Sequence, residues 1–599
     1  MRELLRVRPF VRPYSIGYLW GLLLVVVSNG FAIAAPALLG QAIDALDEPG
    51  ATGRTVVTYA LLVVGVALVS GVARFGMRQL LNSCSRRVET DLRDAFFDKL
   101  LQLDAAFHGR SRTGDIMSRA TNDTQAVRQA IGPGVMYLVN TLVGTVFALV
   151  LMLRISPLLT ALALIPMLLL PPLTLGFSRV LHRQFERIQD QLGAISTFVQ
   201  ESLAGVRIVR AYVQEEAQSR EFDELNRDYL EKNMALARTS GVFHPLLTLL
   251  AGLGMVIVLW IGGRDVILGR ITIGDFVAFG MYLSMLTWPM IALGWVINLF
   301  QRGSASMARL NRIFDSQPEL RPVTQPVRLD TIRGEVEFRE VSFRYPGTER
   351  LVLENVSFRI DAGQTVALVG PTGAGKSTVV ALLARLYDPT SGAVLIDGVP
   401  ADRLRLEQLR GALGVAPQEA FLFSTTIAEN IAVGRAGAET DDELDVTISD
   451  AANVAQLAET IGGFPHGFET RLGERGITLS GGQRQRTTLA RALVRDPRIL
   501  VLDDALSAVD TQTETAILNG LRRVLERRTS MIISHRVTAV MHADLILVLN
   551  EGRIVERGTH SALLAREGLY ATLLRRQLLA EGLDEDVRPD ALAGAGHER

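Results

Sequence analysis

Six long apolar runs, all in the first half of the 599-residue chain, constrain its fold more than any other feature. A helix of about 20 apolar residues crosses the hydrocarbon core of a bilayer. Buried core helices of a soluble protein do not supply six such runs with almost no charge, so six membrane spans are predicted. The spans are expected at Ile16–Leu39, Val56–Met77, Val135–Leu153, Leu158–Phe177, Leu246–Val266 and Ile273–Phe300.

Arginine is unevenly distributed between the spans. It is abundant in the N-terminal segment and in residues 82–128 and 179–238, whereas the short loops near residues 47–54 and 154–157 carry one arginine each. Because positive charge accumulates on the cytoplasmic side of membrane proteins, both termini and the two long stretches are expected in the cytoplasm. Arg264 and Arg270, in a loop on the other side, oppose this assignment.

The two long stretches have the apolar periodicity of helices over Ser85–Asp104 and Gln184–Glu216. They are therefore expected to extend the membrane helices into the cytoplasm. The pattern breaks at glycines within Gly114–Asp123 and Ala204–Tyr212, as it would at a turn or a short crosswise helix.

A proline-rich segment, "DSQPELRPVTQP", separates the two halves of the chain. The membrane domain is assigned to residues 1–315, the linker to 316–334 and a second domain to 335–575. The second domain alternates short β-rich runs with helical runs, which predicts an α/β fold with a largely parallel sheet. Residues 576–599 are polar and expected to be disordered. The net charge of −1 gives no indication of nucleic-acid binding.

The segment "TVALVGPTGAGKSTVVALLARL" contains a phosphate-binding motif between a predicted strand and a predicted helix. The motif is G-x-x-x-x-G-K-S, with Gly370, Gly375, Lys376 and Ser377 at its defined positions. Its glycines let backbone N–H groups surround phosphates, and the helix N-terminus adds its dipole. Lys376 is expected to reach the β- and γ-phosphates and the Ser377 hydroxyl to bind Mg²⁺, so the predicted ligands are ATP and Mg²⁺.

Two further segments complete the phosphate chemistry. "RILVLDD" is a buried strand ending in Asp503, the carboxylate expected to hold the magnesium ion in a P-loop fold. "LSGGQ" begins a helix at Ser480 and is a second anion-binding helix N-terminus. One domain has no need of two phosphate sites for one nucleotide. Two domains that complete each other's sites would explain both, an interpretation that depends on a resemblance to a known family.

These motifs, in this order, resemble those of ABC transporters of the exporter type over nearly the whole chain. The resemblance implies a six-helix membrane domain followed by an α/β P-loop nucleotide-binding domain with a helical subdomain. It also implies that "GDIMSRATND" and "AGVRIVRAY" are the two coupling regions that touch the nucleotide-binding domains, and that Gly473–Gly476 senses them.

The same resemblance assigns site residues. Tyr345 corresponds to the aromatic residue that stacks on adenine, Gln418 to the glutamine near Mg²⁺ and water, and His535 to the switch histidine at the γ-phosphate. The residues implied to bind ATP are Tyr345, Gly370, Thr372, Gly373, Gly375, Lys376, Ser377 and Thr378. Those implied to hold magnesium are Ser377, Gln418 and Asp503. Those implied to act on the partner's site are Ser480, Gly481, Gly482, Gln483 and Asp510, the last in the loop Ser507–Asp510.

The chain departs from the family at Asp504, where the family has the glutamate that polarises the attacking water. An aspartate carboxylate lies about an ångström or more further from that water, a displacement that can cost about 100-fold in rate. Catalysis is thus assigned to Asp504, His535 and Gln418, with an impaired base. This pattern resembles the degenerate-site subunit of heterodimeric bacterial multidrug exporters, with a partner that carries the glutamate. The alternatives are a slow homodimer and an ATP-gated membrane protein without transport; six spans exclude a soluble P-loop ATPase.

The substrate is less constrained. Methionine and aromatic residues gather in the sixth span and suit varied apolar ligands, although helix packing explains them equally well: Met281, Tyr282, Met285, Trp288 and Met290. Pro166, Pro171, Pro172 and Pro289 are expected to kink the fourth and sixth spans. A hydrophobic drug, a lipid or a peptide fits. The resemblance places the chain in a bacterial inner membrane, with its nucleotide-binding domain in the cytoplasm.

Overall fold

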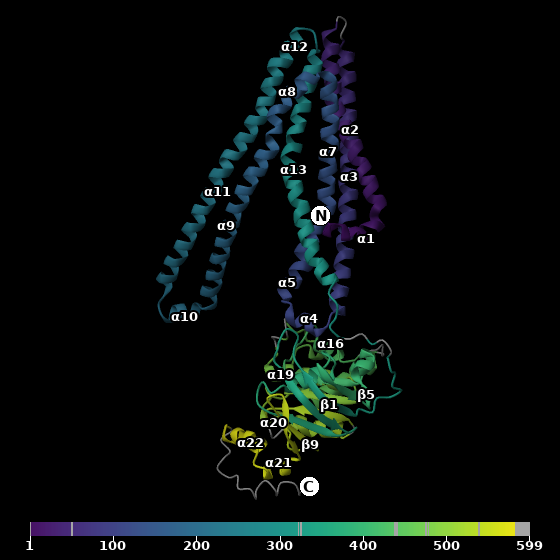
Figure 1. Ribbon diagram of the computed structural model, residues 1–599, viewed down its shortest axis with the longest axis vertical. Helices are drawn as coiled ribbons and strands as arrows, with labels where there is room; N and C mark the ends of the chain where they lie inside the picture. Colours follow the sequence, from purple (N-terminus) through teal and green to yellow (C-terminus); the bar gives the residue numbers. More distant parts are fainter. Residues whose placement is uncertain are drawn as a thin grey trace. The chain divides into compact units, whose positions relative to one another are not determined.

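The structure is a computed structural model that describes residues 2–48, 52–320, 323, 326–435, 441–473, 476, 479–526, 528–536 and 540–580. The chain divides into two compact units, Met1–Leu101 with Arg112–Ser316, and Gln102–Ser111 with Gln317–Arg599. The first unit is helical, and the second contains both β-sheets (Figure 1).

The six predicted spans are confirmed, because each lies inside one of six helical runs that are long and apolar enough to cross a membrane. Short elements at the start are η1 (Glu3–Val7), α1 (Arg8–Val11) and η2 (Arg12–Tyr14). The longer helices are α2 (Ser15–Asp47), α3 (Gly53–Gln102), α7 (Val135–Ile155), α8 (Pro157–Leu168), α9 (Leu170–Ala204), α11 (Glu215–Ile257) and α13 (Ile273–Phe314), and the short helix α12 (Gly263–Ile267) precedes α13. Helix α3 has 50 residues, about 75 Å of helix, so it extends well beyond a bilayer core of about 30 Å.

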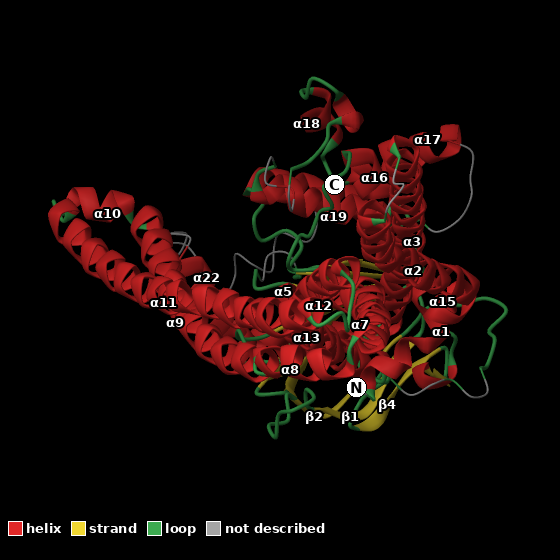
Figure 2. Ribbon diagram, turned by 90° about the horizontal axis from the view of Figure 1, so that it is seen from above, coloured by secondary structure: helices red, strands yellow, loops and turns green. Residues whose placement is uncertain are grey.

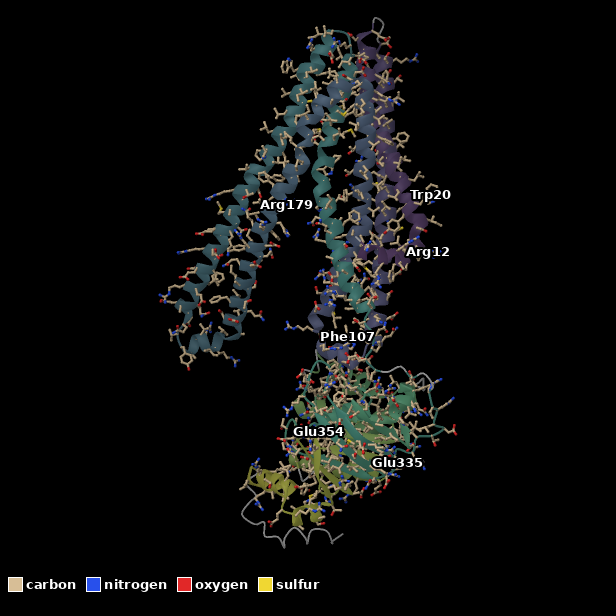
Figure 3. All side chains as sticks on the ribbon, viewed as in Figure 1. Arg12, Trp20, Phe107, Arg179, Glu335 and Glu354 are labelled. Carbon is tan, nitrogen blue, oxygen red and sulfur yellow. The ribbon has the colours of Figure 1, made fainter. Side chains whose placement is uncertain are left out.

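The helices of the first unit form two groups. Helix α13 packs against α2 and α7, and α11 packs against α9 and α8. Figures 1 and 2 show α9 and α11 as an antiparallel pair that leaves the other helices and is joined at its far end by α10 (Val206–Ala211). Large apolar side chains cover the outside of the unit; Trp20, for example, is 57% exposed and points outward in Figure 3. Such a surface suits contact with lipid.

The prolines of the fourth span coincide with a break in the helix. Helix α8 contains Pro166 and ends at Leu168, and α9 starts at Leu170 with prolines in its first turn. Helix α13, by contrast, continues through Pro289.

The positive charge of Arg270, which argued against the predicted orientation of the spans, is partly offset. Arg270 lies 3.2 Å from the acidic residue Asp265.

The predicted position of the first break was a few residues too late, since the helix is interrupted at residues 103–104 and again at residues 111–112. Gly114–Asp123 is helical throughout, in α5 (Thr113–Ser118) and a π-helical turn (Arg119–Asp123). The break falls earlier, around α4 (Ala105–Arg110), because Asp104 caps that helix by accepting a hydrogen bond from Phe107 N at 3.1 Å. The second break is confirmed, since α9 ends at Ala204, Gly205 caps it and the short helix α10 follows. After the first break the chain continues through α6 (Thr124–Gln129) and a second π-helical turn (Ala130–Gly134).

The second unit contains the predicted parallel sheet. Its strands are β3 (Thr365–Val369), β6 (Leu413–Ala416), β7 (Ile499–Asp503), β8 (Thr529–Ile533), β9 (Leu545–Asn550) and β10 (Arg553–Gly558). Their order is β10-β9-β3-β8-β7-β6, and only β9 and β10 pair antiparallel. Alternate residues of the central strands enter two apolar clusters, Ala367 and Leu502 in one, Leu368 and Val501 in the other. Both faces of this sheet are therefore covered.

A second, antiparallel sheet was not predicted. It consists of β1 (Val336–Phe343), β2 (Leu353–Ile360), β4 (Ser391–Ile396) and β5 (Val399–Pro400) in the order β2-β1-β4-β5. Exposed residues interrupt the buried ones in β1 and β2, as in a sheet with one solvent-facing side. One such surface contact, the ion pair of Glu354 with Arg553, joins β2 to β10.

Helices complete the second unit: α14 (Lys376–Leu383), α15 (Leu406–Gly411), α16 (Ile427–Ala432), α17 (Asp441–Val454), α18 (Ala458–Gly462), α19 (Gly481–Leu493), α20 (Thr511–Leu525), α21 (His560–Ala565) and α22 (Leu569–Ala580). Because α22 continues to Ala580, residues 576–580 are helical rather than disordered. Residues 581–599, and Glu474 and Arg475 of the predicted sensing segment, lie outside the described residues.

Candidate ATP-binding site

The phosphate-binding loop connects β3 to α14, as predicted. Its glycines are required by space and by backbone conformation: a Cβ on Gly370 would lie 2.0 Å from Leu549 O, and Gly375 has a φ of +102°. Gly373, at φ +83°, has nothing near a Cβ position. The loop is thus open where a phosphate would approach.

Lys376 begins α14 and is buried, with 7% of its surface exposed. Its Nζ donates to Gly370 O at 2.8 Å and to Pro371 O at 2.9 Å, so the side chain folds over its own loop. An ammonium has three N–H donors, which leaves one for a phosphate oxygen. Burial lowers the pKa of Lys376, and the charges of Asp504 and Asp503 oppose that shift.

A pocket of about 230 Å³ lies beside this loop and collects most of the predicted site. The predicted residues that line it are Thr372, Gly373, Gly375, Lys376, Ser377, Thr378, Gln418, Asp503, Asp504 and His535. They come from the loop, from α14 and from the ends of three strands of one sheet. Segments more than 100 residues apart in sequence therefore converge where the parallel strands end.

Three oxygen donors in this pocket fit a magnesium ion. Asp503 ends β7 and is 6% exposed, and the Ser377 hydroxyl donates a hydrogen bond to its carboxylate. Burial raises the pKa of the Asp503 carboxyl, and the Ser377 bond acts in the opposite direction. Gln418, two residues after β6, adds an amide oxygen. Hydroxyl, carboxylate and amide oxygens are ligands that Mg²⁺ accepts.

Asp504 follows in an unusual backbone conformation, with φ at +49°. Aspartate adopts this left-handed conformation more readily than most residues. Its N–H donates to Ile533 O at 2.8 Å, and its carboxylate oxygens lie 3.5 Å from His535 N and 4.0 Å from His535 Nε2. The carboxylate is thus directed at the His535 segment, inside the pocket.

Tyr345 contacts the pocket through Thr378, since the two side-chain oxygens lie 3.1 Å apart. Its ring meets Phe343 and Tyr387 edge-on, with centroid distances of 4.9 Å and 5.3 Å. Tyr387 belongs to this aromatic group and was not singled out from the sequence. Burial raises the pKa of the Tyr387 hydroxyl above its ordinary value.

The signature residues do not line this pocket. Ser480 caps α19 in a reciprocal pair with Gln483: Gln483 N donates to Ser480 Oγ at 3.3 Å, and Ser480 N donates to Gln483 Oε1 at 2.9 Å. A Cβ on Gly482 would lie 2.8 Å from Ala508 O, and one on Gly481 would lie 3.6 Å from Ala508 Cβ. Asp510 caps α20 by accepting from Thr513 N at 2.9 Å, and backbone donation from Thr513 lowers the pKa of Asp510.

Gln485, which the sequence did not single out, joins the signature helix to the segment after Asp504. It is 6% exposed. Its Nε2 donates to Ser507 Oγ at 2.8 Å and lies 3.4 Å from Asp504 O, and its Oε1 accepts from Ala508 N at 2.8 Å. Arg536 holds the same segment from the other side, since its guanidinium pairs with Glu514 and lies 3.3 Å from Ser507 O. In the sequence, the only indication that Gln485 has a role is its position two residues after "LSGGQ".

Gln485→Leu is expected to loosen residues 504–510. Leaving Ala508 N and Ser507 Oγ without their partner costs about 2 kcal/mol, because buried polar groups lose their hydrogen bonds. Hydrogen–deuterium exchange of the peptide spanning residues 504–510 should then become faster by about tenfold or more. Gln485→Glu, which keeps the acceptor for Ala508 N, should show a smaller change. Equal exchange in the wild type and the Leu variant would contradict this role.

Comparisons with known proteins agree with both units. The family model described as "ABC transporter transmembrane region" matches residues 18–290, and that described as "ABC transporter" matches residues 353–507. The probable multidrug resistance ABC transporter ATP-binding/permease protein YheI of Bacillus subtilis (strain 168) is 39% identical over 575 residues, 95% of this chain and 97% of the relative. The multidrug resistance-like ATP-binding protein MdlA of Escherichia coli (strain K12) is 36% identical, with 95% of both chains covered.

A lipid transporter and a solved structure are also similar. The ATP-dependent lipid A-core flippase of Nitrosococcus oceani is 33% identical, over 96% of this chain and 95% of the relative. The solved structure is described as a bacterial Atm1-family ABC exporter with ATP bound. It matches with a TM-score of 0.76 and 31% identity, over 95% of this chain and 98% of the other.

Proposed function

Because this chain belongs to the ABC transporter family, as an exporter with a membrane region followed by an ATPase domain, we propose that it is one subunit of a heterodimeric exporter. Its substrates are hydrophobic or amphipathic molecules: drugs, lipids or peptides. The multidrug and lipid transporters among its relatives support this class of substrate. The chain spans a bacterial inner membrane, with its nucleotide-binding domain and termini in the cytoplasm, in keeping with its arginine-rich loops.

The proposed site holds ATP mainly through the loop of residues 370–378. Lys376 donates its remaining N–H to a phosphate, and Tyr345 stacks on adenine. Ser377, Gln418 and Asp503 hold magnesium, which neutralises phosphate charge when bound. His535 contacts the γ-phosphate, and Asp504 takes the position of the base.

The identity of Asp504 carries the proposal of a degenerate site. Its carboxylate is one C–C bond, about 1.5 Å, shorter in reach than the family's glutamate, and a base must lie within about 3 Å of the water that it activates. Ser480, Gly481, Gly482, Gln483 and Asp510 are intact and serve the partner's site. This chain therefore binds ATP at its own site, and the partner, with its glutamate, hydrolyses ATP at the other.

Purification from native membranes through an affinity tag on this chain tests the pairing. A second, non-identical ABC half-transporter with a glutamate after its magnesium aspartate is expected in equal amount. Recovery of this chain alone, as a dimer of 65.4-kDa subunits, would favour the slow homodimer instead.

We propose α4, in place of the predicted Gly114–Asp123, as the first coupling helix. Residues 102–111 group with the nucleotide-binding unit, and Asp104 connects them to it: its Oδ2 accepts from Glu319 N and, at 3.1 Å, from Leu320 N. Since α3 precedes this segment and the helical run Thr113–Ile155 follows it, motion of the nucleotide domain would pass directly into two helical runs that are long enough to cross a membrane.

Asp104→Ala is expected to weaken this coupling. The substitution removes the cap of α4, worth about 1 kcal/mol, and leaves two further N–H groups without their acceptor. Stimulation of ATP turnover by a transported substrate should fall several-fold in the assembled exporter, with basal turnover retained. Asp104→Asn can still cap the helix, so its stimulation should lie between that of the wild type and that of the Ala variant. Full stimulation in the Ala variant would exclude the role of α4.

A further inference from the structure

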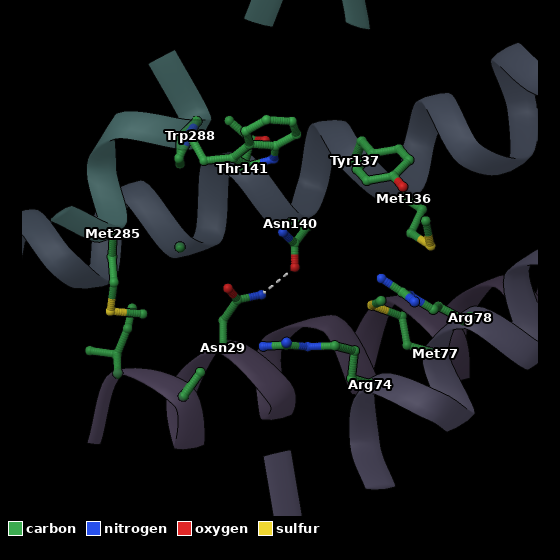
Figure 4. Close-up of a pocket in the computed structure, with 14 residues that line it drawn as sticks. Asn29, Arg74, Met77, Arg78, Met136, Tyr137, Asn140, Thr141, Met285 and Trp288 are labelled. Carbon is green, nitrogen blue, oxygen red and sulfur yellow. Dashed lines mark hydrogen bonds between the residues drawn. The ribbon is translucent and has the colours of Figure 1, made fainter. Parts of the chain in front are cut away.

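A pocket of about 270 Å³ lies between α2, α3, α7 and α13 of the membrane domain (Figure 4). Two asparagines cross it: Asn29 Nδ2 on α2 donates to Asn140 Oδ1 on α7 at 2.9 Å. Asn29 Nδ2 also donates to Val25 O at 2.8 Å. Polar side chains within a membrane domain are costly and usually mark a functional site. This pocket therefore has a polar side that packing alone does not require.

Two arginines of α3, Arg74 and Arg78, line the same pocket. They are one helical turn apart and so lie on the same face of the helix. Figure 4 shows the guanidinium of Arg74 directed toward Asn29. Both side chains are exposed, and neither has a hydrogen bond or ion pair with any residue that the structure describes. None of the 14 lining residues is acidic. The pocket thus carries two positive charges that no lining residue compensates.

Both arginines lie near the end of the apolar stretch of α3. Arg74 follows Val56, the start of the apolar stretch, by eighteen residues, about 27 Å along the helix. A hydrocarbon core is about 30 Å thick, so the Arg74 backbone lies near its boundary. Arginine side chains near the end of a span can reach the interface, but here both line a pocket that contains no acidic residue. An anionic ligand would supply the opposite charge.

The rest of the lining is apolar and adaptable. Met77, Met136, Met285 and Trp288 surround the polar side (Figure 4). Methionine is flexible and polarizable, which allows it to fit ligands of different shape. Tyr137 is held more firmly, because its ring meets Trp295 edge-on at 5.0 Å.

We propose that this pocket binds organic anions: molecules with an acidic group, such as a sulfonate, phosphate or carboxylate, on an apolar body. Arg74 and Arg78 pair with the acidic group, and the methionines and Trp288 contact the apolar body. This inference rests on the proposed export function and names the substrate class. Cationic substrates are disfavoured, because they would lie beside the positive charges of Arg74 and Arg78.

A pair of probes with one fluorophore and opposite charge tests the proposal. The full chain is placed in nanodiscs of zwitterionic lipid and titrated with dansyl sulfonate or with a dansyl amide bearing a quaternary ammonium. Energy transfer from tryptophan reports binding, because Trp288 lines the pocket. The wild type should bind the sulfonate more tightly than the cation. Raising the salt concentration should weaken the binding of the sulfonate but not that of the cation.

The double variant Arg74→Gln/Arg78→Gln should bind the sulfonate at least tenfold more weakly. Arg87→Gln is the matched control, since Arg87 is an exposed arginine of the same helix that does not line the pocket. It should bind the sulfonate like the wild type, and all three proteins should bind ATP equally. Unchanged sulfonate affinity in the double variant, or a wild type that prefers the cation, would overturn the anion site.

Two sources of the anion can be separated in the same assay. If anionic lipid occupies the pocket, adding phosphatidylglycerol to the nanodiscs should compete with the sulfonate in the wild type. If a soluble anion is the substrate, sulfonate binding should still depend on Arg74 and Arg78, and phosphatidylglycerol should not change it.

Uptake into inside-out vesicles containing the assembled exporter distinguishes a failure of this inference from a failure of the proposed function. Arginine-dependent binding without ATP-driven uptake of any probe would contradict export but leave the anion site. ATP-driven uptake of sulfonate that is equal in the wild type and the double variant would contradict the anion site but leave export.

Discussion

Asp504→Glu is expected to raise the steady-state ATP turnover of the purified chain by at least tenfold. The substitution extends the carboxylate by one C–C bond, about 1.5 Å, from a position inside the pocket that Lys376, Ser377 and His535 also line. A displacement of about an ångström in a catalytic group can change the rate about 100-fold. The remaining ATP-binding residues are unchanged, so ATP affinity should stay within about threefold. Release of phosphate by both proteins, measured side by side, checks the prediction.

The backbone at Asp504 supplies the control. Asparagine tolerates a left-handed conformation as aspartate does, so Asp504→Asn should fold normally and remain inactive. Glutamate is less suited to a φ of +49°, and the Glu variant should lose about 1 kcal/mol of stability. A wild type that already hydrolyses ATP as fast as the Glu variant would show that the aspartate is a competent base.

Lys376→Ala is expected to lower the affinity of the chain for ATP by about 100-fold. The substitution removes the buried ammonium that is available to a phosphate, and a charge-assisted hydrogen bond of this kind contributes about 1.5–3 kcal/mol. It also removes the two hydrogen bonds to Gly370 O and Pro371 O that hold the loop closed. Isothermal titration of the full chain with ATP measures the loss.

Two matched lysine variants make the result specific. Lys376→Arg should bind almost as weakly as the alanine variant, because a planar guanidinium does not replace a compact ammonium in a closed loop. Lys232→Ala removes a lysine of α11 that pairs with Asp228 at 2.6 Å and should bind ATP like the wild type. ATP affinity unaffected by Lys376→Ala would mean that the loop does not hold the phosphates as described.

Features encoded within one continuous segment were predictable from the sequence. The six spans depend on the length and apolar character of single runs, and the phosphate-binding loop on a strand, a glycine pattern and a helix in succession. The structure places Lys376 and Ser377 in the first turn of α14 directly after that loop. Asp503 likewise ends its strand at the predicted position.

Features that depend on distant contacts were missed. The position of α4 is set partly by Asp104, which accepts hydrogen bonds from Glu319 N and Leu320 N, 215 and 216 residues further on. Gln485 resembles any polar residue of an amphipathic helix until the fold brings Ser507 to it. Arg74 and Arg78 resemble ordinary charges at the end of a span until α2 and α7 bring Asn29 and Asn140 into the same pocket.

The nucleotide retained by the chain tests the degenerate site most directly. The purified chain would be incubated with Mg²⁺ and ATP, freed of unbound nucleotide and denatured, and the released nucleotide identified by ion-exchange chromatography. The wild type is predicted to release mainly ATP, and Asp504→Glu mainly ADP. ADP as the main nucleotide from the wild type would show that Asp504 supports hydrolysis at its own site and would contradict the degenerate-site account.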